Sequence, residues 1–310
     1  MGLGSGLVDR VTDTLPVRAA LIVNAKSRKG QHLFREACGL LRATGIELVL
    51  AEAVRDPNRL SPSVEAAVEA GIPMIIVGGG DGSISSSVDH VVGTETVFAV
   101  LPLGTANSFA RTLGIPLDLP GAVDVIANGR ARTIDLGMID EDYFANCATI
   151  GIAPQIAETV PHGLKAWLGR PGYLVWAAWQ LVRFRGFVLT IDDGEEAETM
   201  KAVEIRIANG PYHGGIDLVD DARLDSGQIV VQVVTGTTRR NLVWSWMLSV
   251  LRHPARERTT RDFSGQAIRI ATKPRLPISI DGELLARTPV TARIARRAIR
   301  VAAPGPDVNA

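Results

Sequence analysis

Short apolar runs alternate with helix-patterned segments through the first hundred residues of the chain. The runs lie at Ala19–Val23, Glu47–Ala51, Met74–Val77 and Thr96–Leu101, and Ser61–Ala70 has the pattern of a helix with Ser61 as its N-cap. This alternation predicts a parallel sheet with helices on both faces. Ligands of such sheets bind beyond the carboxyl ends of the strands.

The pattern changes after about residue 131, where many short β-like runs replace the alternation. Two helical stretches interrupt them, at Gly172–Arg185 and at about Thr238–Arg252. We expect a β-rich, sandwich-like second domain. The predicted divisions are a flexible tail at 1–16, an α/β domain at 17–131, a β-rich domain at 132–304 and a tail at 305–310. The β-like runs are Phe144–Ala148, Val188–Ile191, Val203–Ile207, Ile229–Val234, Ala267–Ile270, Ile278–Ile280 and Val290–Ile294.

The charges of the chain balance, with 33 Lys and Arg against 33 Asp and Glu. A protein without net charge has no overall field to attract nucleic acid, so we expect no nucleic-acid partner. The two cysteines, Cys38 and Cys147, exclude a disulfide scaffold and favour the reducing cytoplasm. The longest apolar stretches fall short of the about 20 residues that cross a bilayer, so any membrane contact is expected to be peripheral.

A glycine-rich loop, Gly78-Gly79-Gly80-Asp81-Gly82-Ser83, follows an apolar strand and opens a predicted helix. Four glycines allow close approach of the backbone to a ligand, and free N–H groups at a helix start favour an anion such as phosphate. Asp81 suits a bound Mg²⁺ or a nucleotide hydroxyl. A plain connecting turn is the alternative. The dinucleotide fingerprint fails because position 85 is Ser85.

A second polar loop follows the strand that ends at Leu101. Thr105, Asn107 and Ser108 lie in it, just before the next predicted helix. These side chains either cap that helix or bind phosphate oxygens together with the free N–H groups. Because both loops follow strands of one parallel sheet, we expect them at the same edge.

Seven segments occur in the order typical of one enzyme family, and together they resemble the diacylglycerol kinase catalytic family. The resemblance is strongest to small bacterial lipid kinases, which are similar to sphingosine and ceramide kinases and more distantly to NAD kinases. The segments are Leu21-Ile22-Val23-Asn24-Ala25-Lys26-Ser27; Gly79-Gly80-Asp81-Gly82-Ser83; Leu101-Pro102-Leu103-Gly104-Thr105-Ala106-Asn107-Ser108-Phe109-Ala110; Asp135-Leu136-Gly137; Asn146-Cys147-Ala148-Thr149-Ile150-Gly151; Asp221-Ala222-Arg223-Leu224-Asp225-Ser226-Gly227; and Ile280-Asp281-Gly282-Glu283.

The resemblance implies a nucleotide-binding α/β domain, a β-rich lipid-substrate domain and an active site in the cleft between them. It implies ATP and Mg²⁺ as cofactors and a lipid alcohol at the membrane surface as phosphoryl acceptor. By position in the motifs, Glu283 is the expected general base, Asp81 is expected to serve in catalysis and to hold metal, and Asp225 is a second metal candidate. The residues expected to bind the nucleotide are Asn24, Gly79, Gly80, Asp81, Gly82, Ser83, Ser85, Ser86, Gly104, Thr105 and Asn107.

The chain departs from the family pattern near the expected nucleotide. Ser83 replaces the usual Thr and keeps its hydroxyl, whereas Ser85-Ser86 replace Asn-Glu and lose a carboxylate. Ala25 and Arg28 stand where the first motif usually has Pro and Gly. These changes leave open a weakened or altered kinase.

The segment that the resemblance gives to an accessory metal also departs from the family pattern. The family usually presents Asp-Gly there, and this chain has Ser226-Gly227. Asp225 is adjacent, so either it substitutes or that metal is lost.

Glu283 has two readings. A carboxylate on a tight turn in a cleft can take a proton from an acceptor hydroxyl. The plainer reading is a hairpin turn at Asp281-Gly282, with Glu283 starting the next strand. Local sequence favours the hairpin, and the position within the family motif favours the base.

Two aromatic-rich helical stretches bear on the lipid. Tyr173–Arg185 and Leu242–Arg252 combine Trp with Arg, as interfacial helices do. Two core helices with tryptophans packed under the sheet are the alternative that local sequence favours. Either arrangement suits a lipid that enters a groove between helices.

We therefore expect an ATP-dependent lipid kinase that transfers the γ-phosphate to a hydroxyl of diacylglycerol or a related lipid. One alternative is an NAD-kinase-like enzyme with a soluble acceptor. Another is a nucleotide- or lipid-binding protein of the same fold without turnover. The oligomeric state is left open, a homodimer included.

Overall fold

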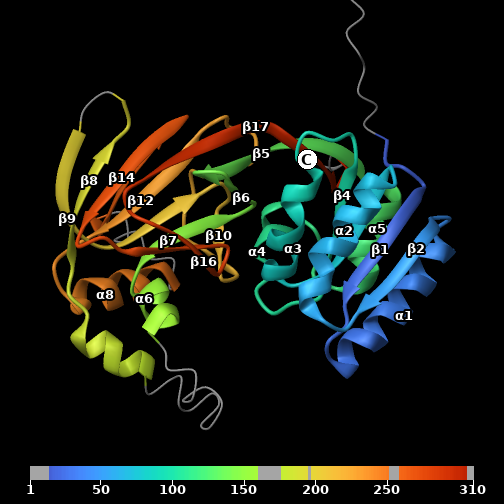
Figure 1. The fold of residues 1–310 in the computed structure, drawn as a ribbon, viewed down its shortest axis with the longest axis horizontal. Coiled ribbons are helices and arrows are strands. Elements are labelled where there is room, and N and C mark those ends of the chain that lie inside the picture. The colour runs from blue at the N-terminus through green and yellow to red at the C-terminus, as the bar shows by residue number, and fades with distance from the viewer. Residues whose placement is uncertain (1–13, 160–175, 195–196, 251–257, 306–310) are drawn as a thin grey trace, which may run out of the picture.

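The computed structural model describes residues 14–159, 176–194, 197–250 and 258–305. Four parallel strands form the N-terminal half, in the order β2, β1, β3, β4 (Figure 1). Their bounds are β1 Arg18–Asn24, β2 Glu47–Val54, β3 Met74–Gly79 and β4 Val97–Pro102. β3 and β4 are buried throughout, as expected of central strands of a parallel sheet.

Helices cover both faces of this sheet. α1 packs against α5 on one side, and α2 packs against α3 on the other. Ser27 caps α1 by accepting a hydrogen bond from the Gly30 N–H, and Asp118 caps α5 in the same way. The parallel α/β half is therefore confirmed. The bounds are α1 Arg28–Ala43, η1 Pro57–Arg59, α2 Leu60–Glu69, α3 Asp81–Val88, η2 Asp89–Val91, α4 Ser108–Thr112 and α5 Leu119–Asn128.

The predicted N-cap at Ser61 is wrong. A 3₁₀ turn runs directly into α2, so the helix begins at Leu60 and Arg59 takes the cap position without a side-chain hydrogen bond. The Ser61 hydroxyl instead lies 2.7 Å from Nε2 of His90.

The C-terminal half is a curved, mostly antiparallel layer of strands, which confirms the β-rich prediction. α6 (Ile152–Thr159), the helical segment 176–183 and α8 (Arg239–Val250) lie on its lower side in Figure 1. The predicted helix starting at residue 172 is described from residue 176 onward, and residues 251 and 252 lie outside the described part. The strands are β5 Arg130–Ile139, β6 Asp142–Phe144, β7 Cys147–Gly151, β8 Phe187–Asp192, β9 Ala197–Ala208, β10 Tyr212–His213, β11 Ile216–Asp217, β12 Ile229–Thr235, β13 Thr260–Gly265, β14 Ala267–Lys273, β15 Pro277–Ile280, β16 Glu283–Arg287 and β17 Val290–Ala303.

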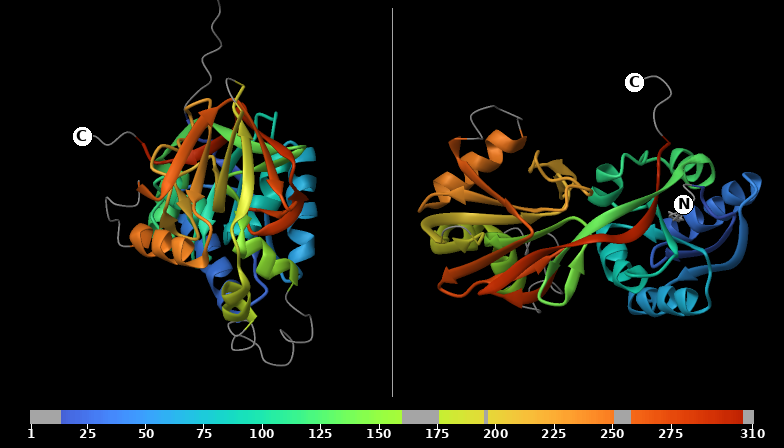
Figure 2. Two further views of the ribbon diagram at one scale, coloured as in Figure 1. Left: turned by 90° about the vertical axis from the view of Figure 1, so that its left-hand side faces the viewer. Right: turned by 90° about the horizontal axis from the view of Figure 1, so that it is seen from above.

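The last strand, β17, joins the two halves. It pairs with β5 and β14 in antiparallel fashion, and Arg300 and Val301 pair with β4 in parallel. Ile299 and Val301 are buried in the N-terminal core, whereas Val290 belongs to the C-terminal one. Figure 2 shows β5 and β17 crossing together from one half to the other. The domain boundaries at residues 131 and 304 stay predictions.

Candidate functional site

Three loops meet at the carboxyl-terminal edge of the parallel sheet. They follow β1, β3 and β4, as the alternating pattern predicts. Asn24 at the end of β1 donates a hydrogen bond to Oγ of Ser83 in α3, over 3.1 Å. Asp81 Oδ1 accepts one from the Phe109 N–H at 3.3 Å, which ties the β3 loop to the β4 loop.

Glycine is required where these loops touch. A Cβ on Gly104 would lie 2.5 Å from Cα of Gly80, and one on Gly79 would lie 2.5 Å from the Ser83 side chain. Gly82 has nothing within 4 Å of such a Cβ, so packing does not demand glycine there. The loops after β3 and β4 therefore form one cradle of closely packed backbone, defined by the buried Gly79, the half-buried Gly80 and the exposed Gly104.

Asn107 braces the second loop from within. Its backbone is left-handed, with φ 50°, and its side chain is buried. Oδ1 accepts from the Gly104 N–H at 2.9 Å, and Nδ2 donates to the Gly104 carbonyl at 3.1 Å. Because both ends of the amide are used inside the loop, Asn107 shapes the cradle, while the exposed Thr105 side chain faces solvent.

A small pocket of about 180 Å³ opens beside the cradle. Three of its lining residues, Asn24, Gly79 and Gly80, belong to the set that the motifs predict. The sequence analysis did not predict that the first turn of α1 lines this pocket. Gly30 in that turn packs closely on the end of β1, because a Cβ on it would lie 2.9 Å from the Asn24 carbonyl oxygen. The lining residues are Asn24, Ser27, Lys29, Gly30, Leu33, Gly79, Gly80 and Leu103.

The turn between β15 and β16 is a hairpin, as the plainer reading predicts. Asp281 and Gly282 both have positive φ, and Ile280 pairs with Glu283. The Asp281 carboxylate accepts hydrogen bonds from the N–H groups of Ala145, at 3.0 Å, and Cys147, at 3.1 Å. Glu283 is exposed at the first position of β16.

Asp281 links this turn to the glycine loop. Burial raises the pKa of its carboxyl to about 6, and the nearby charge of Asp81 adds to the rise. The Ala145 and Cys147 N–H groups and a hydrogen bond from Ser85 oppose it. Asp281 is a functional candidate that the sequence analysis did not single out. The sequence feature that could have indicated it is an aspartate before a glycine in a predicted turn, close to another carboxylate.

The remaining predicted residues, Ser86 and Asp225, lie apart from each other. The Ser86 hydroxyl donates to the Ser83 carbonyl at 3.3 Å and is exposed. Asp225 lies away from the cradle, and its carboxylate pairs with Arg132 at 2.7 Å. The Ser226 hydroxyl donates to two backbone carbonyls.

Metal ligands do not cluster around Asp225. Across the described residues, no three Asp, Glu, His or Cys side chains are arranged to hold an ion. The accessory metal at Asp225 therefore has no support from the donor set, and we derive no role for it. Asp81 differs, because Mg²⁺ is commonly held by one or two carboxylates together with phosphate oxygens.

An apolar groove of about 400 Å³ lies between α6, segment 176–183 and α8. α6 also packs against β15 and β16, and Glu158 of α6 pairs with Arg287 at the end of β16 opposite the Glu283 turn. Trp179, Trp244 and Trp246 are 42–52% exposed, so these tryptophans are not packed under the sheet. No described helix is long and apolar enough to cross a membrane. The lining residues are Ile152, Ile156, Ala177, Ala178, Leu181, Leu242, Val243 and Trp246.

Two family profiles match almost the whole chain. One, described as "Diacylglycerol kinase catalytic domain", covers residues 18–139. The other, described as "YegS C-terminal NAD kinase beta sandwich-like domain", covers residues 146–303. Their junction falls between β5 and β7, within the β-rich half.

Individual proteins agree with these profiles. A protein of Klebsiella pneumoniae named "Probable lipid kinase YegS-like" is 30% identical over 93% of this chain and 96% of its own. A Staphylococcus aureus protein named "Diacylglycerol kinase" is 28% identical over 94% of each chain. The crystal structure of a diacylglycerol kinase from Bacillus anthracis superposes with a TM-score of 0.73 over 92% of this chain and 96% of the other at 20% identity, which shows a shared fold.

Proposed function

This chain belongs to the diacylglycerol kinase family, in the form with a YegS-type C-terminal domain, and from that premise we propose that it is an ATP- and Mg²⁺-dependent lipid kinase. It transfers the γ-phosphate to a hydroxyl of diacylglycerol or a related lipid. The observation that carries the proposal is the position of Asp281. Its carboxylate lies near Asp81 and Ser85, so the hairpin with Glu283 faces the glycine cradle.

The cradle suits the phosphates of a nucleotide. The backbones of Gly80 and Gly104 are close enough that a Cβ would fill the space between them. N–H groups at the start of the eight-residue α3 favour phosphate oxygens. When bound, ATP would supply the phosphoryl group, and Mg²⁺ would supply positive charge that offsets the negative charge of the phosphate oxygens. Asp81 is the carboxylate that would hold the ion, and Asn24 and Lys29 line the pocket beside the cradle.

The acceptor side of the reaction belongs to the hairpin. Glu283 takes the proton from the lipid hydroxyl as its oxygen bonds to the γ-phosphorus and the bond from that phosphorus to the leaving ADP breaks. Asp281 holds the turn by accepting two backbone N–H groups, so it positions Glu283 and does not itself take part. In-line transfer depends above all on such positioning.

The groove between α6 and α8 suits the apolar chains of the acceptor. Its lining is apolar, and α6 packs against both strands of the β15–β16 hairpin, beside Arg287. A lipid with its chains in this groove would extend its polar end along β16, from Arg287 toward Glu283. The protein then works at the cytoplasmic membrane surface as a peripheral enzyme.

The test is a transfer assay with γ-labelled ATP, Mg²⁺ and a total lipid extract in mixed micelles. Glu283→Gln is compared with Glu47→Gln, which changes an exposed carboxylate on β2 far from the cradle. We expect a labelled lipid from the wild type and the Glu47 variant, and a loss of at least about a hundredfold in kcat with Glu283→Gln. ATP binding without any labelled lipid would instead support a binding protein or a soluble acceptor.

A further inference from the structure

A band of arginines borders the exposed apolar surface beside the groove. Segments 182–185 and 237–240 enclose a pocket of about 670 Å³ between them. Four arginines line it, together with Val182, Phe184, Thr237 and Thr238. The four are Arg183, Arg185, Arg239 and Arg240, and all are exposed.

No carboxylate neutralises these arginines within the described residues. The ion pairs found there involve other arginines, such as Arg206, Arg261 and Arg287. Arg239 donates to the Val182 carbonyl, and the Arg183 guanidinium lies 4.2 Å from the centre of the Trp179 ring. A chain with no net charge thus concentrates at this place positive charge that no described carboxylate pairs with.

Apolar side chains continue the same surface. A second hollow, of about 380 Å³, shares Val182, Arg239 and Arg240 with the arginine pocket. Val182, Val243, Trp244 and Met247 are 42–61% exposed around it. We call the arginine pocket and this apolar rim together the arginine–aromatic face.

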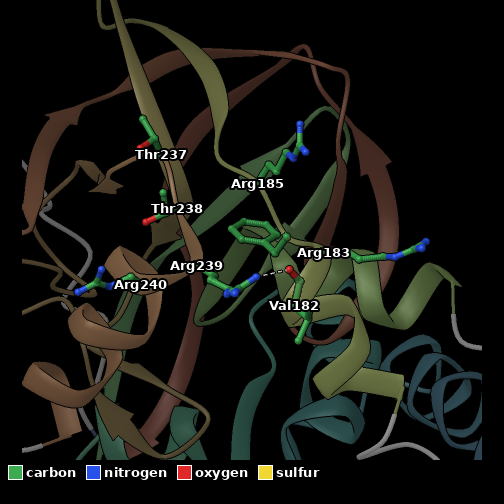
Figure 3. Close-up of a pocket in the computed structure, with 8 residues that line it drawn as sticks. Val182, Arg183, Arg185, Thr237, Thr238, Arg239 and Arg240 are labelled. Atoms are coloured by element: carbon green, nitrogen blue, oxygen red, sulfur yellow. Dashed lines mark hydrogen bonds between the residues drawn. The ribbon is translucent and has the colours of Figure 1, made fainter.

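The arginines do not converge on one point. In Figure 3, Arg183 and Arg240 extend toward opposite sides of the pocket, and Arg185 extends away from both. A single phosphate is held by donors that point at it together. Guanidinium groups spread over a surface instead match many phosphates spread over a plane.

From this arrangement we propose that the arginine–aromatic face docks on a membrane surface rich in anionic phospholipid. The spread guanidinium groups bind lipid phosphates, and the Trp, Val and Met side chains enter the interface. Trp and Arg side by side are suited to this depth, because each has an apolar body and a polar end. Docking here places the mouth of the groove at the bilayer, so a lipid enters it without crossing water.

The inference concerns docking, which takes place without ATP and is measured apart from phosphoryl transfer. The probes are vesicles of phosphatidylcholine alone and of phosphatidylcholine mixed with phosphatidylglycerol, in a co-sedimentation assay at low and high salt. We expect strong preference for the mixed vesicles, lost at high salt because exposed charges are screened. Equal binding to both vesicles would overturn the proposal.

The decisive variant is Arg185→Gln with Arg240→Gln, whose side chains are exposed and lack an ion-pair partner in the described structure. Each arginine near an anionic surface contributes about fivefold to binding, so we expect a loss of about 25-fold. The matched control is Arg35→Gln with Arg42→Gln on α1, which makes the same change in net charge. An equal loss in both double variants would overturn the proposal, because it would reflect net charge alone.

Two further measurements keep the outcome clear. Circular dichroism should give unchanged melting for both double variants. Inorganic phosphate, added at constant ionic strength, should not release the protein from mixed vesicles; release would indicate a site for a soluble anion instead. In detergent micelles the Arg185/Arg240 variant should keep its kinase rate, so a failure of docking is distinguishable from a failure of catalysis.

Discussion

Gly80 and Gly104 lie so close that no side chain fits between them. A Cβ on Gly104 would be 2.5 Å from Cα of Gly80 and 2.8 Å from Oδ1 of Asn107. Backbone contacts of this kind cannot yield as a flexible side chain would. The two residues therefore set the spacing of the two loops that form the cradle.

Gly104→Ala should open the cradle while leaving the sheet intact. The added methyl must push the β4 loop away from Gly80 and disturb the Asn107 bonds to Gly104. We expect the Kd for ATP to rise at least about tenfold, equal to about 1.4 kcal/mol. Isothermal titration with ATP and Mg²⁺ measures it.

The control for this substitution is Gly39→Ala in α1. Nothing lies within 4 Å of a Cβ there, and the position is helical. It should leave ATP binding unchanged and stabilise the fold by about 0.5–1 kcal/mol. Equal ATP affinity in both variants would mean that the cradle does not bind the nucleotide.

The carboxyl of Asp281 should make stability depend on pH. Burial raises its pKa to about 6, above the usual value of about 4, so the folded state holds the proton more tightly than the unfolded state. The contribution of Asp281 to the free energy of unfolding is therefore largest below pH about 4. It falls as the pH rises to about 6 and then stays level.

Asp281→Asn removes this titration. Relative to the variant, the wild type should lose up to about 3 kcal/mol between pH about 4 and pH about 7. Urea unfolding without Mg²⁺ measures both proteins at each pH. Parallel profiles, or a relative gain by the wild type at higher pH, would show that the N–H groups of Ala145 and Cys147 outweigh burial.

Much of the α/β half is predictable because its signals are local. Each buried strand is one apolar run in the sequence, and the glycines after β3 indicate the loop that follows it. The residue at which a helix begins is harder to predict, as Ser61 illustrates. A 3₁₀ turn directly before α2 makes Arg59, and not Ser61, the N-cap residue.

The rest depends on contacts between distant residues. No local pattern states that Val301 pairs with Phe98, or that Asp281 accepts from Ala145 and Cys147. Asn107 shows the same limit within the site. Its residue type predicts a contact with the nucleotide, and only the fold shows that its amide is hydrogen-bonded to Gly104 within the loop.

Leu33→Trp tests the pocket beside the cradle. Leu33 lines this space of about 180 Å³, and a tryptophan would occupy much of it. We expect the Kd for ATP to rise at least about tenfold, with little change in melting temperature. Arg35→Trp adds the same ring to an exposed position of α1 and should bind ATP as the wild type does. Unchanged affinity with Leu33→Trp would place the nucleotide elsewhere.

Glu204 and Arg206 form a buried ion pair beneath α8, with Nη2 of Arg206 2.7 Å from Oε2 of Glu204. The same oxygen accepts from Nε1 of Trp246 at 2.9 Å, so the pair also fixes the helix that borders the apolar groove. Glu204→Gln leaves the Arg206 charge buried without its partner and should cost about 3–5 kcal/mol in the free energy of unfolding.

Urea unfolding measures this cost against Glu47→Gln, which breaks an exposed pair with Arg18 and should cost less than about 0.5 kcal/mol. Replacing both partners, as Glu204→Gln with Arg206→Met, should recover much of the loss, because no unpaired charge then remains. Trp246 would still lack its carboxylate acceptor, so α8 should be held less firmly. A double variant that is stable but binds lipid more weakly would show that the ion pair maintains the shape of the groove. A Glu204→Gln variant as stable as Glu47→Gln would contradict the predicted cost of the unpaired charge.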